Sequence, residues 1–183
     1  MTARGLALLA GIVLAAGGIC PNSGWAQSAT ATPPAIDIKP IGKVLSVSGL
    51  AHIEHPAAVV VQAKLSTGDT PTKIGDLVYE GDIIQTGSDG ALSITFADGT
   101  SFNVSKNAKM EVNNFIYDPN GHSNSSLMSL TKGTFTFIAG NVAHTGDMKV
   151  TTPVGTMGIR GTAPRVEIDD DGTTKFSTLV EQK

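Results

Sequence analysis

The sequence is poor in cysteine and in clustered charge, and each shortage excludes a class of protein. Its single cysteine, Cys20, allows neither an intrachain disulfide nor a cysteine-rich zinc site. Charged residues make up 16%, and the formal net charge of -3 comes without any run of lysine or arginine. A mildly acidic chain of this kind does not fit nucleic-acid binding or strong attraction to an anionic membrane surface.

The N-terminal residues have the pattern of a secretory signal peptide. Arg4 precedes an apolar stretch from Gly5 to Ile19, and small residues then lead to an expected cleavage site after Ala26. Cleavage there removes one basic and no acidic residue, which lowers the net charge from -3 to -4. An uncleaved anchor is the weaker alternative, because a membrane-spanning helix requires about 20 apolar residues. Lipidation of Cys20 is also weaker, because bulky Ile19 stands where a lipoprotein signal has a small residue.

The remaining chain divides into a short leader and one domain. After the signal peptide, predicted over residues 1–26, residues 27–40 are rich in alanine, threonine and proline and predict a flexible or extended leader. Residues 41–183 are the size of one independently stable domain. We expect this domain to be periplasmic or secreted, with no stable membrane span once the signal peptide is removed.

Alternation of apolar and polar residues dominates residues 41–183 and predicts β-strands. Helical spacing is scarce, so little helix is expected beyond the signal peptide. Many short strands at close turn spacing predict an all-β fold, whether a β-roll, a sandwich or a solenoid-like stack. The residues that carry the pattern are Leu45, Val47, Ala51, Ile53, Val59, Val61, Ala63, Leu65, Leu92, Ile94, Phe96, Phe102, Val104, Met110, Val112, Met128, Leu130, Phe135, Phe137, Met148, Val150, Val166, Ile168, Phe176, Thr178 and Val180.

Turn residues separate these alternating runs. Asp98-Gly99 stands between two of them, and such a pair is the strongest short-range indication of a β-hairpin. The last strand of the chain is expected to be the edge of a sheet. Further turns are expected at Asp118–Gly121, Lys132-Gly133 and Asp169–Gly172.

The most unusual segment is Thr151–Thr162, which places one proline, three glycines and one arginine in an apolar and hydroxyl-bearing run. Pro153 suits a strand start or edge, and the glycines permit a bend, a bulge or the close approach of another backbone. Arg160 is expected to have a specific partner, because burying an unpaired charge is costly. That partner is either a carboxylate or phosphate on a ligand or an internal carboxylate. The internal candidates are Glu167, Asp82 and Glu80.

From Ile41 onward the sequence resembles the FecR domain family. The matching pieces, in order, are GKVLSVSG, GDLVYEGDIIQTGSDGALSITFADGTSF, LTKGTFTFIAG and VTTPVGTMGIRGT followed by RVEI. The resemblance implies a periplasmic, all-β, non-enzymatic domain. In regulators of this family, that domain receives a signal from an outer-membrane transporter and passes it to a segment that controls a sigma factor. The motif residues, with a structural or partner-binding role, are Gly81, Asp82, Thr86, Gly87, Asp98, Gly99, Pro153, Gly155, Gly158, Arg160, Gly161 and Thr162.

The N-terminus departs from the regulator pattern. A regulator needs a cytoplasmic segment before its membrane helix, whereas only a few residues precede Gly5 here. This argues against direct control of a sigma factor. The chain instead resembles a stand-alone exported FecR domain, and we expect it to bind an envelope protein for signalling or scaffolding.

No pattern in the sequence predicts catalysis, a cofactor or a metal site. There is no G-x-S-x-G elbow, and the glycines of Thr151–Thr162 do not form a dinucleotide fingerprint. The run Asp169–Asp171 and the loop around Asp118 lack the spacing of a calcium loop and indicate solvated turns. A hydrolase that uses His122 and Ser125 is the enzyme-class alternative. The histidines, which have no metal-ligand spacing, are His52, His55, His122 and His144.

A glycan- or peptidoglycan-binding matrix component is the other alternative. Asparagine, serine and threonine residues between Asn103 and Ser129 form a broad hydroxyl and amide surface. Many β-proteins solvate one sheet face with these residue types. An aromatic platform for sugar is thin, since Trp25 leaves with the signal peptide and the tyrosines are Tyr79 and Tyr117. Protein contact is therefore the preferred prediction.

Overall fold

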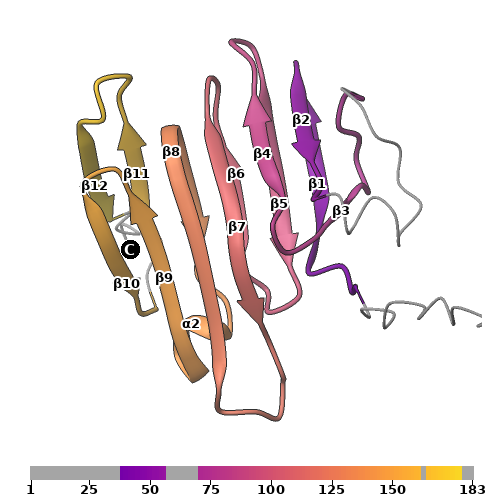
Figure 1. Cartoon of the computed structure of the whole chain (residues 1–183), viewed down its shortest axis with the longest axis vertical. Coiled ribbons are helices and arrows are strands. Elements are labelled where there is room, and N and C mark those ends of the chain that lie inside the picture. Colours follow the sequence, from indigo (N-terminus) through magenta and orange to yellow (C-terminus); the bar gives the residue numbers. More distant parts are fainter. Residues whose placement is uncertain (1–37, 57–69, 162–163, 179–183) are drawn as a thin grey trace, which may run out of the picture. The chain divides into compact units, whose positions relative to one another are not determined.

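The computed structural model describes residues 38–56, 70–161 and 164–178. They form a sheet of 12 strands with one short helix (Figure 1), which confirms the all-β prediction. The predicted signal peptide, most of the leader and the run from Val59 to Leu65 lie outside the described residues. In the described part of the chain, no helix is long and apolar enough to cross a membrane. The elements are β1 (Gly42–Ser48), β2 (Ala51–Glu54), β3 (Leu77–Val78), β4 (Ile83–Thr86), β5 (Ala91–Phe96), β6 (Ser101–Val104), β7 (Lys109–Ile116), β8 (Asn124–Ile138), α2 (Val142–Thr145), β9 (Gly146–Thr152), β10 (Gly155–Ile159), β11 (Pro164–Ile168) and β12 (Thr174–Thr178).

Strand pairing arranges the sheet in two layers that share the long strand β8. Layer A has the order β3-β1-β5-β6-β8-β11-β12, and layer B has the order β2-β4-β7-β8-β9-β10. The first part of β8 pairs with β7 and β9, and its last part pairs with β6 and β11. Every pair is antiparallel except β8 with β9. The sheet therefore folds back on itself through β8.

The core lies between the inner faces of the two layers. In β5, Leu92, Ile94 and Phe96 are buried and alternate with more exposed residues. Phe96 of layer A stacks on Phe115 of layer B with 5.5 Å between the ring centroids, so the inner faces meet directly. Full burial of a side chain of this size contributes about 1.5–3 kcal/mol. For most strands, the alternation seen in the sequence thus identifies the core-facing residues.

Four corners carry the chain from one layer to the other at the same end of the strands, and we call them the corner row. Backbone hydrogen bonds join neighbouring corners: the Gly87 amide donates to Leu50 (2.8 Å), and the Asn107 amide donates to Gly87 (2.9 Å). The row therefore acts as a hydrogen-bonded seam across the end of both layers. The corners are Gly49-Leu50, Gly87–Gly90, Ser105–Ala108 and Gly133.

Gly133 is the corner at which the chain changes layer within a single strand. Its φ is +100°, and a Cβ there would lie 2.4 Å from the Cβ of Ala108, so only glycine fits. The turn predicted at Lys132-Gly133 is wrong, because β8 continues through this point without reversing. The left-handed conformation bends the strand into the other layer.

Leu45 departs from the predicted burial pattern. The register of β1 against β5 shifts between Val44 and Ser46, which makes Leu45 the extra residue of a β-bulge. Val44 is buried, whereas Leu45 is 48% exposed. The predicted core position of Leu45 is therefore wrong, because the inserted residue brings Val44 and Val47 to the same face.

The predicted hairpin at Asp98-Gly99 is confirmed. β5 and β6 pair antiparallel across this turn, with Leu92 opposite Val104. Gly99 has a φ of +86°, as a tight hairpin turn requires. The predicted turn at Asp169–Gly172 is also present, between β11 and β12.

Candidate functional site

The structure distributes the family-motif residues over several places instead of gathering them in one cleft. Thr86 and Gly87 lie in the corner row, where the Thr86 hydroxyl donates to the Ser105 carbonyl (2.6 Å) and accepts from the Ala108 amide (2.9 Å). Gly81 and Asp82 precede β4, and Asp98 and Gly99 follow β5, so both pairs lie at the opposite end of these strands. The segment from Pro153 to Gly161 forms the β9–β10 turn, β10 and its exit, while Thr162 lies outside the described residues.

Buried Asp82 pairs with partly buried His55, a contact that no pattern in the sequence predicts. His55 Nδ1 lies 2.8 Å from Asp82 Oδ1, and the Tyr79 amide donates to Asp82 Oδ2 at 2.8 Å. The His55 and Tyr79 rings meet edge to face with 5.7 Å between centroids. Asp82 is fully buried, and this burial raises the pKa of its carboxyl, although the Tyr79 amide and His55 oppose the shift. The pair fastens the end of β2 to the β3–β4 turn.

Replacing His55 with alanine is expected to raise the pKa of Asp82 further, because His55 favours the ionised carboxylate. The pKa of Asp82 is higher in the folded chain than in the unfolded chain. Its favourable contribution to stability is therefore complete below the unfolded pKa and is lost as the pH rises through the folded pKa. That loss should be greater in the variant. An NMR titration of the Asp82 carboxyl measures the shift, and an unchanged or lower pKa would contradict the pairing.

Asp98 organises the second buried polar cluster and holds the start of α2. Its Oδ1 accepts from the Thr100 amide (2.9 Å), and its Oδ2 accepts from the Thr100 hydroxyl (2.7 Å) and the Val142 amide (3.1 Å). Asn141 occupies the N-cap position of α2, but its side chain makes no capping bond. The carboxylate of Asp98 therefore satisfies a helix amide that would otherwise lie buried without an acceptor.

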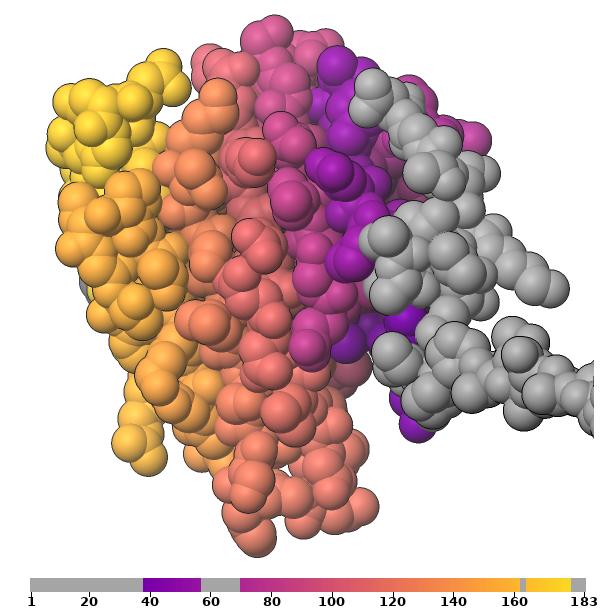
Figure 2. Space-filling model, viewed as in Figure 1, coloured from indigo at the N-terminus to yellow at the C-terminus, as the bar shows by residue number. Residues whose placement is uncertain are grey.

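Two edge strands form the C-terminal side of the described chain. Within the described residues, β10 pairs only with β9, and β12 pairs only with β11. Figure 1 places both strands on the same side, and Figure 2 shows the orange and yellow C-terminal residues on the outside of that side. Val154 is 64% exposed and Phe176 is 46% exposed. This side of the domain therefore presents unpaired backbone together with apolar side chains.

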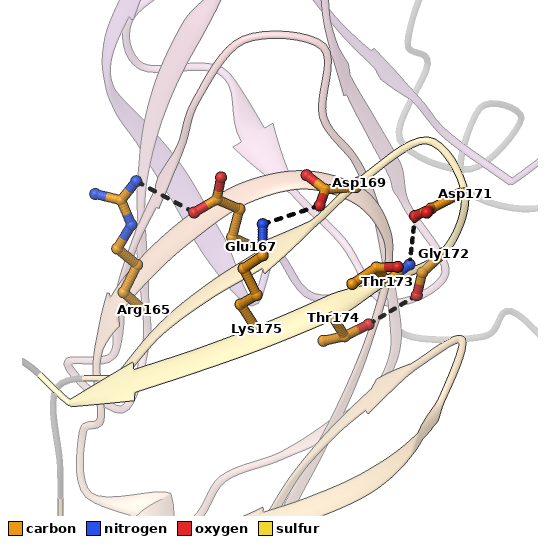
Figure 3. Close-up of polar contacts among 8 residues, drawn as sticks. All are labelled: Arg165, Glu167, Asp169, Asp171, Gly172, Thr173, Thr174 and Lys175. Carbon is orange, nitrogen blue, oxygen red and sulfur yellow. Dashed lines mark hydrogen bonds and ion pairs between the residues drawn. The ribbon is translucent and has the colours of Figure 1, made fainter.

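The β11–β12 hairpin carries a short row of charged side chains on its outer face (Figure 3). Lys175 Nζ lies 3.1 Å from Asp169 Oδ2, and Arg165 lies 3.7 Å from Glu167. In the turn, the Thr173 amide donates to Asp171 Oδ1 at 2.8 Å. Within the described residues, no group of three or more histidine, cysteine, aspartate or glutamate side chains is arranged to hold a metal. These carboxylates serve the turn and surface ion pairs.

Among the described residues, Arg160 does not form the internal ion pair that was expected as one alternative. It is exposed at the end of β10, beyond buried Ile159, and it pairs with no carboxylate among the described residues. An exposed guanidinium is solvated by water, so it needs no protein partner. The three candidate carboxylates have other partners: Glu167 lies near Arg165, Asp82 pairs with His55, and Glu80 accepts from the Phe115 amide.

The residues proposed for a hydrolase do not form a reactive set. His122 is exposed in the β7–β8 connection. The Ser125 hydroxyl donates to Asn114 Oδ1 at 3.0 Å, so its proton is directed to an amide and not to a base. A shallow groove beside β1, lined in part by Pro40, Leu77 and Phe96, offers no nucleophile paired with a base. The geometry brings no nucleophile, base and acid together among the described residues.

The polar face that suggested a glycan site is internally hydrogen-bonded. Ser93 bonds to Asn103 across β5 and β6, and Ser129 bonds to Asn113 across β8 and β7. Tyr79 is buried against the core, and the Tyr117 hydroxyl accepts from the Asn141 side chain. These contacts occupy much of the hydrogen-bonding capacity that a sugar would use.

The fold and these contacts define a two-layer all-β domain with buried polar clusters and, on its C-terminal side, the two edge strands β10 and β12. The family model described as FecR protein matches residues 82–180, more than half of the 183-residue chain, and the chain therefore belongs to the FecR family. The match includes Asp98 and both edge strands. No curated protein and no solved structure matched the chain. Membership of this family is consistent with a signalling or regulatory role without catalysis.

Proposed function

We propose that this chain is an exported, non-catalytic FecR domain that binds another protein of the bacterial envelope for signalling or scaffolding. The N-terminal sequence supports export to the periplasm or beyond, because it has the basic start and apolar stretch of a signal peptide. Family membership supports a regulatory or signalling role. The described residues add a surface suited to protein contact.

The proposal rests mainly on β12, an exposed edge strand that pairs on one side only among the described residues. This strand ends layer A, and four of its five residues are exposed. An unpaired strand edge presents backbone donors and acceptors to an extended segment of another protein, which can add to the sheet as a further strand. Phe176 lies opposite buried Val166 and is 46% exposed, so it provides an apolar contact for the added strand. The envelope partner therefore binds by strand addition at β12.

The glycan-binding alternative has no comparable support. The serine and asparagine side chains of the sheet faces bond to one another, and the two tyrosines are engaged within the domain. A sugar site would require several exposed aromatic rings for stacking. Among the described residues, Phe176 is the aromatic side chain that is clearly exposed, and it lies on the edge strand β12. A protein strand uses both the unpaired backbone and this ring.

Capture of a partner from a bacterial envelope extract tests the proposal. We expect the chain to retain a specific protein, and Phe176→Lys to weaken its binding by about tenfold or more, because a charge at the strand edge opposes strand addition and the aromatic contact is lost. Ile116→Lys is the matched control, since Ile116 is 52% exposed on β7, away from both edge strands. Capture of no specific protein, or equal capture by the Phe176 variant, would contradict the proposal.

A further inference from the structure

The edge strand β10 lacks the features by which soluble proteins protect a free strand edge. Natural edges carry charged residues or proline, or are shortened, bulged or covered. The five residues Gly155–Ile159 include no charge and no proline, and their register against β9 is regular, without a bulge. Among the described residues, β10 pairs with no strand other than β9. An edge of this kind is suited to pairing with another strand.

We infer that β10 pairs with β10 of a second copy of this chain, antiparallel, about a two-fold axis at Met157. This rests on the proposed function, because it gives a partner to the second unpaired edge of the same binding side. In this register Thr156 lies opposite Gly158 of the second copy, and Met157 lies opposite Met157. The interface is isologous, so each protomer contributes the same strand.

Self-complementarity of β10 favours a second copy as the occupant. Because Gly155–Ile159 carry no charge, self-pairing of these five residues opposes no like charges in any register. The other edge strands are less suited. β12 contains Lys175, and β2 contains His52 and Glu54, so some registers of self-pairing would place like charges directly opposite each other.

Gly158 leaves open space beside β10. Its φ is not in the left-handed region, and a Cβ built on it would have no atom within 4 Å, so nothing within the described domain requires glycine there. Glycine in a strand often marks the close approach of another backbone or side chain. In the inferred pairing, Thr156 of the second copy lies over the space that Gly158 leaves. The Thr156 hydroxyl is already positioned by Thr151, 2.9 Å away.

Met157, on the inner side of β10, provides an apolar contact for the inferred pairing. Met157 lies opposite buried Val150 and is only partly buried against the core. Pairing at the two-fold axis places the two Met157 side chains together and removes their remaining exposed surface from water. Because β10 and β12 belong to different layers, this pairing uses none of the backbone groups that β12 offers to an envelope partner.

Cysteine cross-linking of the full chain tests both the pairing and its register. In a Cys20→Ser background, which removes the native thiol, Met157→Cys is expected to form a disulfide-linked dimer under mild oxidation, because directly opposed residues have Cα atoms within disulfide range. Thr156→Cys alone and Gly158→Cys alone should not cross-link. An equal mixture of these two variants should give a dimer, because each cysteine then faces the other.

Sedimentation of the unmodified chain over a concentration series provides the second measurement. A dimer that dissociates on dilution is expected, because five residue pairs make a short interface. Met157→Lys should shift the chain to monomer, since two lysines would meet at the axis, while capture of the envelope partner through β12 is retained. The inference would be overturned if the chain were monomeric at all concentrations. It would also be overturned if Thr156→Cys alone or Gly158→Cys alone cross-linked as well as Met157→Cys. Failure of capture with the dimer intact would instead reject the proposed function.

Discussion

Replacing Gly133 with alanine is expected to destabilise the domain by about 3 kcal/mol or more, since the change adds both backbone strain and a steric clash. The new Cβ would lie 2.4 Å from the Ala108 Cβ and 2.5 Å from its Cα. The φ of +100° also disfavours any residue with a side chain. Because β8 passes from one layer to the other at this residue, a shift there disturbs the pairing of both layers. Urea unfolding of the two proteins measures the difference.

Gly99→Ala is the matched control for this prediction. Gly99 also has a left-handed φ, +86°, but a Cβ there would have no atom within 4 Å. Only the backbone strain applies, so a loss of about 1–2 kcal/mol is expected. Equal losses in the two variants would contradict the close packing of the corner row.

Replacing Asp98 with alanine is expected to cost about 3–5 kcal/mol, because it leaves buried donors without acceptors. The carboxylate accepts from the Thr100 amide, the Thr100 hydroxyl and the Val142 amide. Its loss releases the start of α2 as well as the β5–β6 hairpin. The free energy of unfolding, from urea titration at constant pH, provides the measurement.

Asp171→Ala serves as the control for Asp98. The Asp171 carboxylate also accepts from a backbone amide, that of Thr173, but it lies in an exposed turn where water can replace it. We expect the free energy of unfolding to fall much less than in the Asp98 variant, because water replaces the lost acceptor. If the Asp98 variant were no less stable than this control, its buried cluster would not support the fold.

The fold class could be predicted from the sequence because most strands here have one buried face. In β5, apolar residues alternate with serine and threonine. This alternation predicts a strand without any knowledge of the order of strands in the sheet. Gly133 could not be assigned in the same way. A glycine with a left-handed backbone serves a turn or a corner, and the choice depends on Ala108 and on strands distant in sequence. Leu45 was misplaced because a bulge moves one residue without a local sequence pattern.

The buried polar clusters were only partly predictable. Asp82 and Asp98 stood out as motif residues, but His55 lies 27 residues from Asp82, and the Val142 amide lies 44 residues from Asp98. Neither separation leaves a local pattern. Helix α2 has four residues, too few to show helical periodicity. A partner for Arg160 was expected because burying an unpaired charge is costly. That cost does not arise, because Arg160 is exposed just beyond the end of β10.

Hydrogen exchange of the β12 amides, measured with and without the captured envelope protein, tests the central claim most directly. If the partner adds as a strand, exchange in residues 174–178 slows on binding, while exchange in the corner row is unchanged. A partner that binds tightly, leaves these amides exchanging as in the free chain and protects another surface would contradict the account.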